Sequence, residues 1–419
     1  MIDNMRHDIH NKNEDELRLF YEKYPYPEPV EDLDDYRKQW QDKHKRIADF
    51  YLFWPDKTFS EEYNILVAGC GTSQAAKHAM RHPEARVTGI DFNSTGIDHT
   101  NKLKDKYNLT NLNVIQLSVE NVKELAMSFD KIICTGVLHH LPDPEAGLKA
   151  LREVLKPDGA IHLMVYAPYG RTGIYMMQEF CRLLSIQADD TSIRKLMKAI
   201  SGLPPGHPLE TLIRNAPDFQ HEAALADALL NPRDRAYSVP QLFDFIKKAG
   251  MKFGRWIKQA QYSCHCGILS QLPQVEEILK LSLEEQYAAA ELFRGTMVRH
   301  SFVAYRNDHP RNKEIKFDDD NWMDYIPVRL QDTICVFEQL PEGAAAILFN
   351  KTPYRDLYMP VNTSEKNLYD AIDGNCIDNI IKKTFPSSDR KSNLEISRTF
   401  FEKLWWYDQI VFDTTKSLE

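Results

Sequence analysis

The sequence predicts an α/β fold, in which a doubly wound parallel sheet is followed by a small α+β domain. Short apolar runs alternate with helical patterns across residues 61–167, which is the order of a parallel sheet with helices on both faces. The runs are almost continuously apolar, as expected for strands buried on both sides. The composition changes after the stretch RNDHPRNKEIKFDDDN, so residues 325–419 are expected to form a separate domain.

The predicted elements of the sheet follow in a regular order. The strands are the apolar runs Tyr63–Ala68, Ala85–Asp91, Leu112–Leu117, Phe129–Thr135 and Gly159–Tyr166. The helices between them are Ser73–Arg81, Ser94–Tyr107 and Pro144–Leu155. Gly159 follows Lys-Pro-Asp, so it is expected in a turn between the last helix and the fifth strand. Residues 1–60 form an N-terminal segment, and the main domain is expected to cover 61–306.

The bulk composition narrows the class of protein. A chain of 419 residues, 43% hydrophobic and 27% charged, is typical of two or three globular domains. No apolar run approaches the roughly 18 residues of a membrane span, and the N-terminus lacks the apolar core of a secretion signal. We therefore expect a cytoplasmic protein without a membrane partner. The net charge of -9 and the lack of a dense basic run argue against nucleic acid as the main partner.

The cysteines do not indicate a metal site or a disulfide framework. Their number, seven, is odd, and no export signal is visible, so reduced thiols are expected. Cys264, His265 and Cys266 are spaced too closely for a structural zinc site, and no second ligand pair accompanies them. No metal is therefore predicted. In a strand, the two cysteines would face the same side.

The stretch ILVAGCGTSQAA is the first candidate binding element. Gly69 and Gly71 come just after the first strand, where glycine permits a sharp turn and a close approach by a ligand. Asp91 ends the second strand, where a carboxylate can accept hydrogen bonds from both hydroxyls of a ribose. Ligands of doubly wound sheets bind beyond these strand ends. The turn and the acid together predict a ligand that contains adenosine.

Two adenosine ligands compete for this turn. A dinucleotide fingerprint requires a third glycine, which lets the helix pack closely behind the pyrophosphate. Gln74 occupies that position here. S-adenosylmethionine has no pyrophosphate, so the sequence favours it over NAD.

Three stretches carry a resemblance to a known family: ILVAGCGTSQAAKHA, VTGIDFNSTGI and FDKIICTGVLHHLPDPEAGLKALREVLKPDGAIHLMVY. They resemble consecutive motifs of class I S-adenosylmethionine-dependent methyltransferases. The resemblance covers about residues 60–167 and extends loosely to 305 through GRWIKQAQYS and RHSFVAYR. It implies a seven-stranded, Rossmann-like sheet whose last strand, RHSFVAYR, is antiparallel.

The resemblance also implies a set of cofactor-binding residues. Those expected at the methionine part are Ala68, Gly69, Cys70, Gly71 and Thr72. Asp91 would hold the ribose and Phe92 would stack near the adenine, flanked by Ser118, Val119 and Glu120. Thr135, Gly136 and Val137 would line the site after the fourth strand. Val67 and Ser73 depart from the acid and the glycine that are frequent in the family, so recognition of the methionine amine is expected to differ.

Candidate catalytic residues follow the fourth and fifth strands. Methyl transfer needs an acceptor roughly 3–3.5 Å from the methyl carbon with water excluded, and an amine acceptor also needs a base. His139 or His140 is a candidate base; the alternative is that LHHL only starts a helix. Tyr166 is a candidate catalytic residue and Tyr169 a substrate-binding one. Arg171 is a candidate ligand for a substrate carboxylate, or else a structural residue bonded to backbone.

The N-terminal stretch FYEKYPYPEPVEDL is a candidate cap over the cofactor. Its prolines predict an extended segment. Tyr24 is then a candidate catalytic residue and Tyr26 a candidate substrate-binding residue, with one of them facing the pocket. The alternative is an aromatic strap that packs on the outside of the sheet.

Residues at about 170–240 form a helical insertion and a candidate lid. Within it, NPRDRAYSVPQLFDFIKKAG predicts a helix that starts at Ser238 and Pro240. Arg233, Arg235 and Tyr237 are candidate substrate-binding residues. The alternative is a charge network that fixes the loop.

The C-terminal segment predicts three strands and then three helices. The strands are DTICVFEQL, GAAAILFNKT and RDLYMPV; the helices are SEKNLYDAID, CIDNIIKKTF and NLEISRTFFEKLWWYDQIVF, the first capped by Ser364. This order resembles the small winged-helix domains that bind leader peptides, which implies a peptide partner added to a sheet edge. The alternative is a packing or dimerisation module, with a homodimer as the candidate assembly.

The sequence therefore predicts a methyltransferase that uses S-adenosylmethionine to methylate a peptide, a protein side chain or a small metabolite. Two other classes remain open. One is a non-catalytic binding module with a methyltransferase fold, and the other is an NAD-dependent oxidoreductase.

Overall fold

The computed structural model describes residues 19–24, 28–215, 221–310, 314–386 and 389–418. These residues form two compact units. The first comprises the described parts of Met1–Lys38, Glu61–Gly254 and Glu291–Asp308, and the second those of Gln39–Ser60, Arg255–Ala290 and His309–Glu419. Tyr26 lies outside the described residues.

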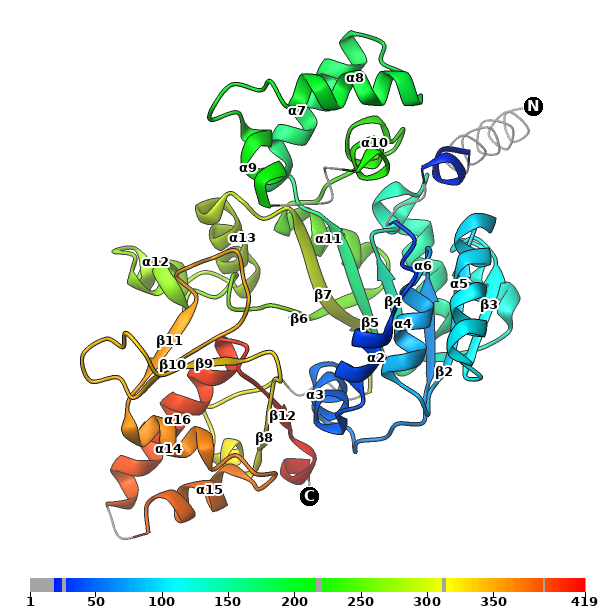
Figure 1. The fold of residues 1–419 in the computed structure, drawn as a ribbon. Helices are drawn as coiled ribbons and strands as arrows, with labels where there is room; N and C mark the ends of the chain where they lie inside the picture. The colour runs from blue at the N-terminus through cyan, green and yellow to red at the C-terminus, as the bar shows by residue number, and fades with distance from the viewer. Residues whose placement is uncertain (1–18, 25–27, 216–220, 311–313, 387–388, 419) are drawn as a thin grey trace. The chain divides into compact units, whose positions relative to one another are not determined.

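The first unit is built on a seven-stranded sheet with the order β3-β2-β1-β4-β5-β7-β6 (Figure 1). The strands are β1 (Asn64–Ala68), β2 (Arg86–Asp91), β3 (Leu112–Gln116), β4 (Phe129–Thr135), β5 (Leu155–Tyr166), β6 (Met251–Trp256) and β7 (Arg299–Arg306). The pairs from β3 to β5 are parallel, whereas β7 runs antiparallel to β5. The predicted doubly wound sheet with an antiparallel seventh strand is confirmed.

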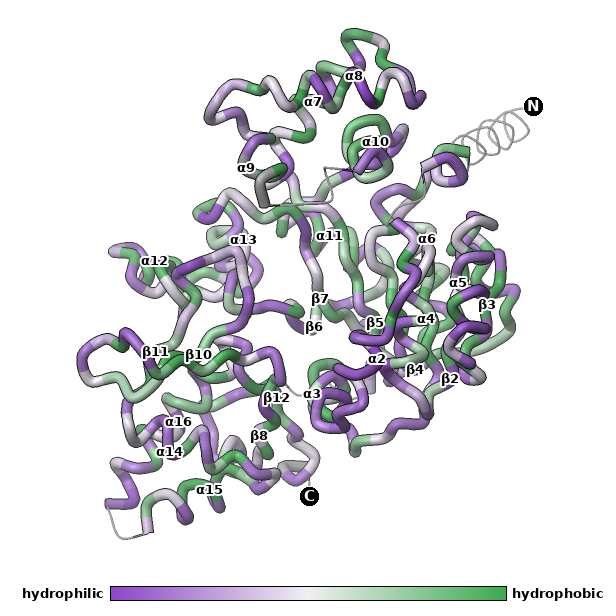
Figure 2. Tube along the Cα trace, in the orientation of Figure 1, coloured by the Kyte–Doolittle hydropathy of each residue, from purple (hydrophilic) through white to green (hydrophobic). Residues whose placement is uncertain are grey.

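Helices connect the strands of this sheet. They are α4 (Gln74–Arg81), α5 (Ser94–Tyr107), α6 (Pro144–Val154) and α11 (Val239–Lys248). Helices α5 and α6 begin at side-chain caps. Asn93 accepts a hydrogen bond from the Thr95 N–H at the start of α5, and Asp143 accepts one from the Ala146 N–H at the start of α6. Such caps satisfy backbone donors that have no partner within the helix. Figure 2 shows hydrophobic residues concentrated in the sheet strands, with hydrophilic residues more frequent on the helices.

The prediction of a turn at Gly159 is wrong. Helix α6 ends at Val154 and β5 starts at the next residue, so Gly159 lies inside the strand. A Cβ atom at this position would lie 2.9 Å from the Asp130 carbonyl oxygen and 2.7 Å from Leu155 Cδ1. The glycine is therefore needed for a close approach between β5 and β4, at the point where their register shifts.

The predicted insertion is helical and has its own core. It contains α7 (Thr172–Leu183), α8 (Asp190–Ile200), α9 (Pro208–Asn215) and α10 (Glu222–Leu230), which Figure 1 shows grouped near the end of β5 and β7. Buried apolar side chains from these helices pack together, among them Ile174, Leu196 and Leu225. The insertion is thus a packed substructure of the first unit.

The prediction of an extended N-terminal segment is wrong for residues 20–23, whereas residues 28–33 contain neither helix nor strand. Residues 19–23 are helical. Phe20 and Tyr24, one helical turn apart, are buried in the core of the insertion. The Tyr24 hydroxyl donates to the Asp190 carboxylate over 2.9 Å. Tyr24 therefore points into the insertion, and the adjacent Tyr21 has a different environment.

The second unit contains two small sheets and a helical layer. Strands β9 (Ile334–Val336), β10 (Ala346–Phe349) and β11 (Tyr358–Val361) form an antiparallel sheet of order β11-β10-β9, while β8 (Ile326–Arg329) pairs with β12 (Ile410–Asp413). The helices are α14 (Thr363–Asp370), α15 (Ile377–Thr384) and α16 (Arg390–Trp406). The three predicted strands and three predicted helices are present, but the last helix stops at Trp406. The apolar run after it forms β12, because β8 supplies a pairing partner.

Further α-helices lie before β1 or between β6 and β7. Helix α2 (Asp34–Trp40) and α3 (Lys43–Phe53) precede β1, and α12 (Val275–Leu279) and α13 (Leu283–Arg294) lie between β6 and β7. Ala260, Cys266, Phe317 and Trp322 belong to the core that α16 helps to form. The second unit thus includes residues that precede position 325 in the chain.

The stretch around Cys264 is a turn and not a strand. Cys264 and Cys266 are buried, and no disulfide joins any two of the seven cysteines. Among the residues that the structure describes, no group of three or more His, Cys, Asp and Glu side chains is arranged to hold a metal ion. Within the same ranges, no helix is both long enough and apolar enough to cross a membrane.

Helix α14 is capped by Asn362 and not, as predicted, by Ser364. The Asn362 side chain accepts from the Glu365 N–H over 3.0 Å, and the Glu365 carboxylate accepts from the Asn362 N–H over 2.8 Å. This reciprocal capping box ties up two backbone donors at once.

We expect Asn362→Ala to lower the free energy of unfolding of the second unit by about 1 kcal/mol, because it removes the side-chain acceptor of this cap. Chemical denaturation checks this value. Ser364→Ala is the matched control and should change stability by much less. Equal effects of the two substitutions would contradict the assignment of the cap.

Candidate active site

A cavity of about 460 Å³ lies beyond the carboxyl ends of the central strands of the first unit. All residues that the sequence predicted for the cofactor line it, with the exception of Ala68: Gly69, Cys70, Gly71, Thr72, Asp91, Phe92, Ser118, Val119, Glu120, Thr135, Gly136 and Val137. Ala68 is the last residue of β1 and is buried. The topology thus brings four sequence segments to one wall.

The glycine turn after β1 is set by backbone conformation and by close packing. Gly69 has a φ of +68° and Gly71 a φ of +52°, a region that favours glycine. A Cβ atom on Gly69 would lie only 2.3 Å from Val137 Cγ2. The Cys70 N–H donates to the Ile90 carbonyl over 2.9 Å, which fixes the turn against β2. The turn therefore presents bare backbone to the cavity.

Asp91 is the buried anion of this wall. Its carboxylate accepts hydrogen bonds from the Gly71 N–H at 2.8 Å and the Asn93 N–H at 2.9 Å. Burial raises the pKa of Asp91, and these backbone hydrogen bonds oppose the rise. Asp91 therefore braces the glycine turn in addition to lining the cavity.

Helix α4 packs closely on the sheet without a third glycine in the turn. A Cβ atom on Gly89 of β2 would lie 2.7 Å from Ala75 Cβ, so the small residue needed for close packing is on the strand. The Gln74 side chain is free to face the cavity, where it lies 3.0 Å (Nε2) from Thr135 Oγ1. Gln74, which stands where a dinucleotide fingerprint has its third glycine, is thus a polar residue of the cavity lining.

This wall fits the adenosyl group of S-adenosylmethionine. Bare backbone at Gly69 and Gly71 leaves room for the ligand, and Asp91 offers a carboxylate at the end of β2. The aromatic ring of Phe92 and the apolar side chain of Val119 also line the cavity. The described residues around it leave a space of about 460 Å³.

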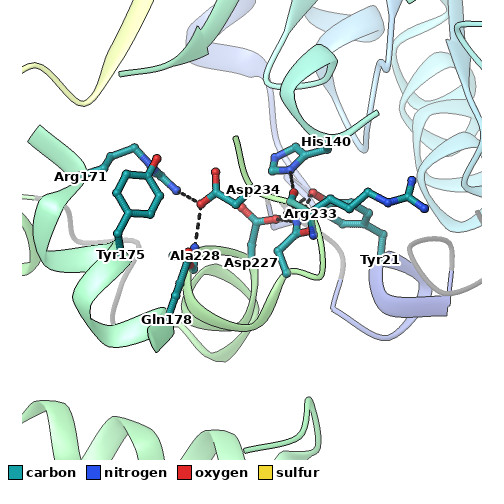
Figure 3. Close-up of polar contacts among 10 residues, drawn as sticks. Tyr21, His140, Arg171, Tyr175, Gln178, Asp227, Ala228, Arg233 and Asp234 are labelled. Carbon is teal, nitrogen blue, oxygen red and sulfur yellow. Dashed lines mark hydrogen bonds and ion pairs between the residues drawn. The ribbon is translucent and has the colours of Figure 1, made fainter. Parts of the chain in front are cut away.

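Another set of side chains lines the same cavity and comes from outside the cofactor motifs. It consists of Tyr21, His140, Met164, Tyr166, Asp227, Arg233 and Arg299. Figure 3 shows Tyr21, His140, Asp227 and Arg233 lying together. Arg299 begins β7 and is opposite Tyr166 in the register of β5 with β7. This group gives the cavity a second, more polar part.

Tyr21 and Asp227 form the centre of a hydrogen-bonded cluster. The Tyr21 hydroxyl donates to Asp227 Oδ1 over 2.8 Å, and Asn231 Nδ2 lies 3.0 Å from each of these two oxygens. Burial, followed by the Asp227 charge, raises the pKa of Tyr21 well above its usual value, so the hydroxyl stays protonated. The Tyr21 ring also meets the edges of Phe92 and His140. The N-terminal helix and α10 thus meet at the cavity.

The two adjacent histidines have different surroundings. His140 lines the cavity, and its Nδ1 is hydrogen-bonded to the Arg233 carbonyl. Because a carbonyl only accepts, Nδ1 carries the proton and Nε2 of the neutral ring is an acceptor. His139 is buried, and among the described residues neither of its ring nitrogens has a hydrogen-bond partner. Burial, followed by the nearby His140 and Arg171, lowers its pKa well below the usual range, so His139 is neutral and packed against Tyr166.

Arg171 is held away from the cavity by a buried ion pair. Its Nη2 lies 2.5 Å from Asp234 Oδ2, and its guanidinium stacks on the Tyr166 ring at 3.5 Å. Gln178 Nε2 donates to the same Asp234 oxygen (Figure 3). Arg171 therefore packs against Tyr166 in a structural arrangement, although its partner is the Asp234 carboxylate and not the backbone that the structural alternative named.

The other predicted substrate-binding residues are dispersed. Tyr169 is 41% exposed and does not line the cavity. Arg235 and Tyr237 line a separate open groove between α6 and α11, together with Asp143 and Lys248. Only Arg233 of the three candidates in that loop reaches the cavity.

Sequence reasoning missed Tyr21, Gln74, Asp227 and Arg299 as candidate site residues. Asp227 carried a usable signal: it is the one acid within the apolar helical run AALADALL. An acid on a buried helix face needs a polar partner, and here the partners are Tyr21 and Asn231.

Comparison with family models and curated proteins finds a methyltransferase domain in the first unit. Residues 66–161 match the model of a methyltransferase domain. An uncharacterised protein of Synechococcus is 32% identical over 250 residues, which cover 57% of this chain and 58% of that protein. A ubiquinone biosynthesis O-methyltransferase of Actinobacillus pleuropneumoniae is 32% identical over 102 residues, or 23% of this chain and 43% of that enzyme. The chain thus spans about half the length of these curated relatives.

Solved structures show where this fold recurs. PKMT2 from Rickettsia typhi superposes with a TM-score of 0.65 at 15% identity, over 90% of this chain and 76% of that one. The same protein in complex with AdoHcy gives a TM-score of 0.63 at 16% identity, over 89% and 75%. The similarity at this identity concerns the fold. Together with the matched family model, it shows a methyltransferase domain at residues 66–161, within a Rossmann-like sheet.

Proposed function

We propose that this protein transfers the methyl group of S-adenosylmethionine to an amine nitrogen on a peptide, a protein side chain or a small metabolite. The observation that carries the proposal is that one cavity joins two chemically different parts. The wall proposed to bind the adenosyl group and the cluster of Tyr21, His140 and Asp227 both line it. A donor and an acceptor held in one enclosed space react without the entropic cost of a bimolecular encounter.

The residues that would hold the cofactor are those of the first wall. Backbone at Gly69 and Gly71 would follow the sulfonium part, and Asp91 would accept from the ribose hydroxyls. When bound, the cofactor supplies an electrophilic methyl group on a positively charged sulfur. The aromatic rings of Phe92 and Tyr21 line the same cavity, where aromatic rings favour a positively charged group.

Asp227 supports an amine as the acceptor. Its side chain is 4% exposed, and Oδ1 already accepts from Tyr21 and Asn231. No basic side chain forms an ion pair with Asp227 among the residues that the structure describes. A buried carboxylate without a counter-ion is costly, so a protonated amine is the complementary ligand. The rings of Tyr21 and Tyr166 in the same cavity also favour a cation.

His140 is the proposed base. A protonated amine must lose a proton before its nitrogen can attack the methyl carbon. The Nδ1–H of His140 donates to the Arg233 carbonyl, so Nε2 is left to accept a proton. His140 lines the cavity, where a substrate amine would lie. His139 and Arg171 would act as positioning residues, since both pack against the Tyr166 ring.

We expect Asp227→Asn to raise the KM for an amine substrate by about 10-fold, because the neutral amide no longer attracts the ammonium group. Methyl transfer from labelled cofactor to a panel of amines and hydroxyl compounds measures this effect. Asp190→Asn is the matched control, since Asp190 accepts from Tyr24 within the insertion and does not line the cavity. An unchanged KM, or methylation of hydroxyl compounds alone, would contradict the proposal.

A role for the second unit in peptide recognition is a further part of the proposal. Strands β9 and β11 are the edges of its antiparallel sheet, and an extended peptide binds such edges through backbone hydrogen bonds. The winged-helix resemblance and the dimerisation alternative both stay predictions. If the protein bound no S-adenosylhomocysteine, one of the two other classes would be favoured. Binding of NAD would then favour an NAD-dependent enzyme, and no binding of NAD would favour a non-catalytic binding module.

A further inference from the structure

S-adenosylmethionine carries a free α-amino acid at the end opposite to its adenine. That end has an ammonium group, which needs hydrogen-bond acceptors, and a carboxylate, which needs donors. Asp91 is on β2, the glycine turn follows β1, and Thr135 ends β4. In the sheet these strands lie in the order β2-β1-β4. A ligand whose ribose is at Asp91 and which crosses the turn therefore reaches the end of β4 with its amino-acid part.

The polar side chain at that place is Gln74. It is the first residue of α4, it lines the cavity, and its amide meets the Thr135 hydroxyl. Nε2 lies 3.0 Å and Oε1 3.2 Å from Thr135 Oγ1. Val67, beneath the turn on β1, is fully buried and apolar, so it offers no hydrogen bond.

The hydrogen-bonding capacity of a primary amide matches an α-amino acid. An amide has two N–H donors and an oxygen with two lone pairs. The contact with Thr135 occupies only part of this capacity. What remains is a donor for the carboxylate and an acceptor for the ammonium group. The N-cap residue of α4, Ser73, makes no side-chain capping bond, so the partial positive charge of the helix start adds to the attraction of a carboxylate.

We infer that Gln74, held in place by Thr135, recognises the amino-acid end of S-adenosylmethionine and makes the site selective for it. The inference rests on the assigned cofactor and concerns a residue outside the set predicted from the cofactor motifs. Thr135 acts as a positioning residue: its hydroxyl limits the rotamers of Gln74.

The test compares two ligands that differ in the amino-acid part. Calorimetric titrations use S-adenosylhomocysteine, which has this part, and 5′-methylthioadenosine, which lacks it. We expect Gln74→Leu to weaken S-adenosylhomocysteine binding by about 10-fold and to change 5′-methylthioadenosine binding by less than about twofold. Thr135→Val is expected to give the same pattern with a smaller effect, and Thr135→Ser to restore wild-type binding.

The controls separate the possible outcomes. Asp91→Asn should weaken both ligands, because both contain the ribose. Equal weakening of the two ligands by Gln74→Leu, or no change for either, would overturn the inference. If the wild-type protein binds neither ligand, the assignment of the cofactor itself fails, which is a different result. Thermal unfolding of each variant excludes global destabilisation as the cause.

Discussion

Gly69→Ala is expected to abolish measurable cofactor binding, with a loss of affinity of at least about 100-fold. The new Cβ atom would lie 2.3 Å from Val137 Cγ2, a distance at which one of the two segments must move. Both segments line the cavity, so either movement reshapes the wall that receives the cofactor. The positive φ of +68° adds strain for any residue other than glycine. Titration with S-adenosylhomocysteine measures the loss.

Gly206→Ala is a control for alanine at a positive-φ glycine that does not line the cavity. Gly206 has a φ of +83°, but a Cβ atom there would meet nothing within 4 Å. This variant pays the conformational cost alone and should bind the cofactor normally. Normal binding by Gly69→Ala would contradict the role of the turn. If Gly69→Ala does not fold, the double variant Gly69→Ala/Val137→Ala is used instead. It removes the valine methyl groups that clash with the new Cβ atom, so it should recover part of the binding.

Asp91→Ala is expected to lower cofactor affinity on the order of 100-fold. The substitution removes the charge-assisted acceptor proposed for the ribose, and each such bond contributes roughly 1.5–3 kcal/mol. It also releases the Gly71 N–H, which Asp91 holds at 2.8 Å. The same titration with S-adenosylhomocysteine measures the change in affinity.

Asp91→Asn distinguishes these two contributions. The amide keeps an acceptor for the Gly71 N–H but loses the charge, so its affinity should fall between those of the wild type and the alanine variant. An alanine variant with wild-type affinity would mean that the ribose is bound elsewhere. Asp244→Ala, in the groove formed with α11, is a control for loss of a carboxylate outside the cavity.

The sheet and the glycine turn were predictable because local sequence determines them. Apolar runs such as Phe129–Thr135 are too short for helices and are bounded by polar turns, and Gly69 and Gly71 mark a backbone that other residues rarely adopt. The order of these elements then places Asp91 and Thr135 at the same edge, since parallel strands share their carboxyl ends.

The acceptor part of the cavity was less predictable because it depends on tertiary packing. The prolines in FYEKYPYPEP suggested an extended strap, yet the residues before them are helical. Phe20 and Tyr24 share the buried face of that helix, so Tyr21 and not Tyr24 reaches the cavity. Asp227 comes more than 200 residues later in the chain, with a separation of 206 residues from Tyr21. No local pattern connects two residues at that distance.

Gly159 and Asn362 show how local alternatives are decided. Gly159 was compatible with a turn or with close strand packing, and the carbonyl of Asp130 on the neighbouring strand decides for packing. Asn362 and Ser364 are both good capping residues, and the choice depends on which one has an acid three residues later. Glu365 follows Asn362 at that spacing and completes the reciprocal cap.

The claim on which the account depends is that the cavity beside Gly69 and Asp91 binds the adenosyl cofactor. The most direct measurement is a calorimetric titration of the full chain with S-adenosylhomocysteine, with NAD as the competing ligand. The account predicts saturable binding of one S-adenosylhomocysteine per chain and no binding of NAD. Binding of NAD, with no heat from S-adenosylhomocysteine at millimolar concentration, would contradict it.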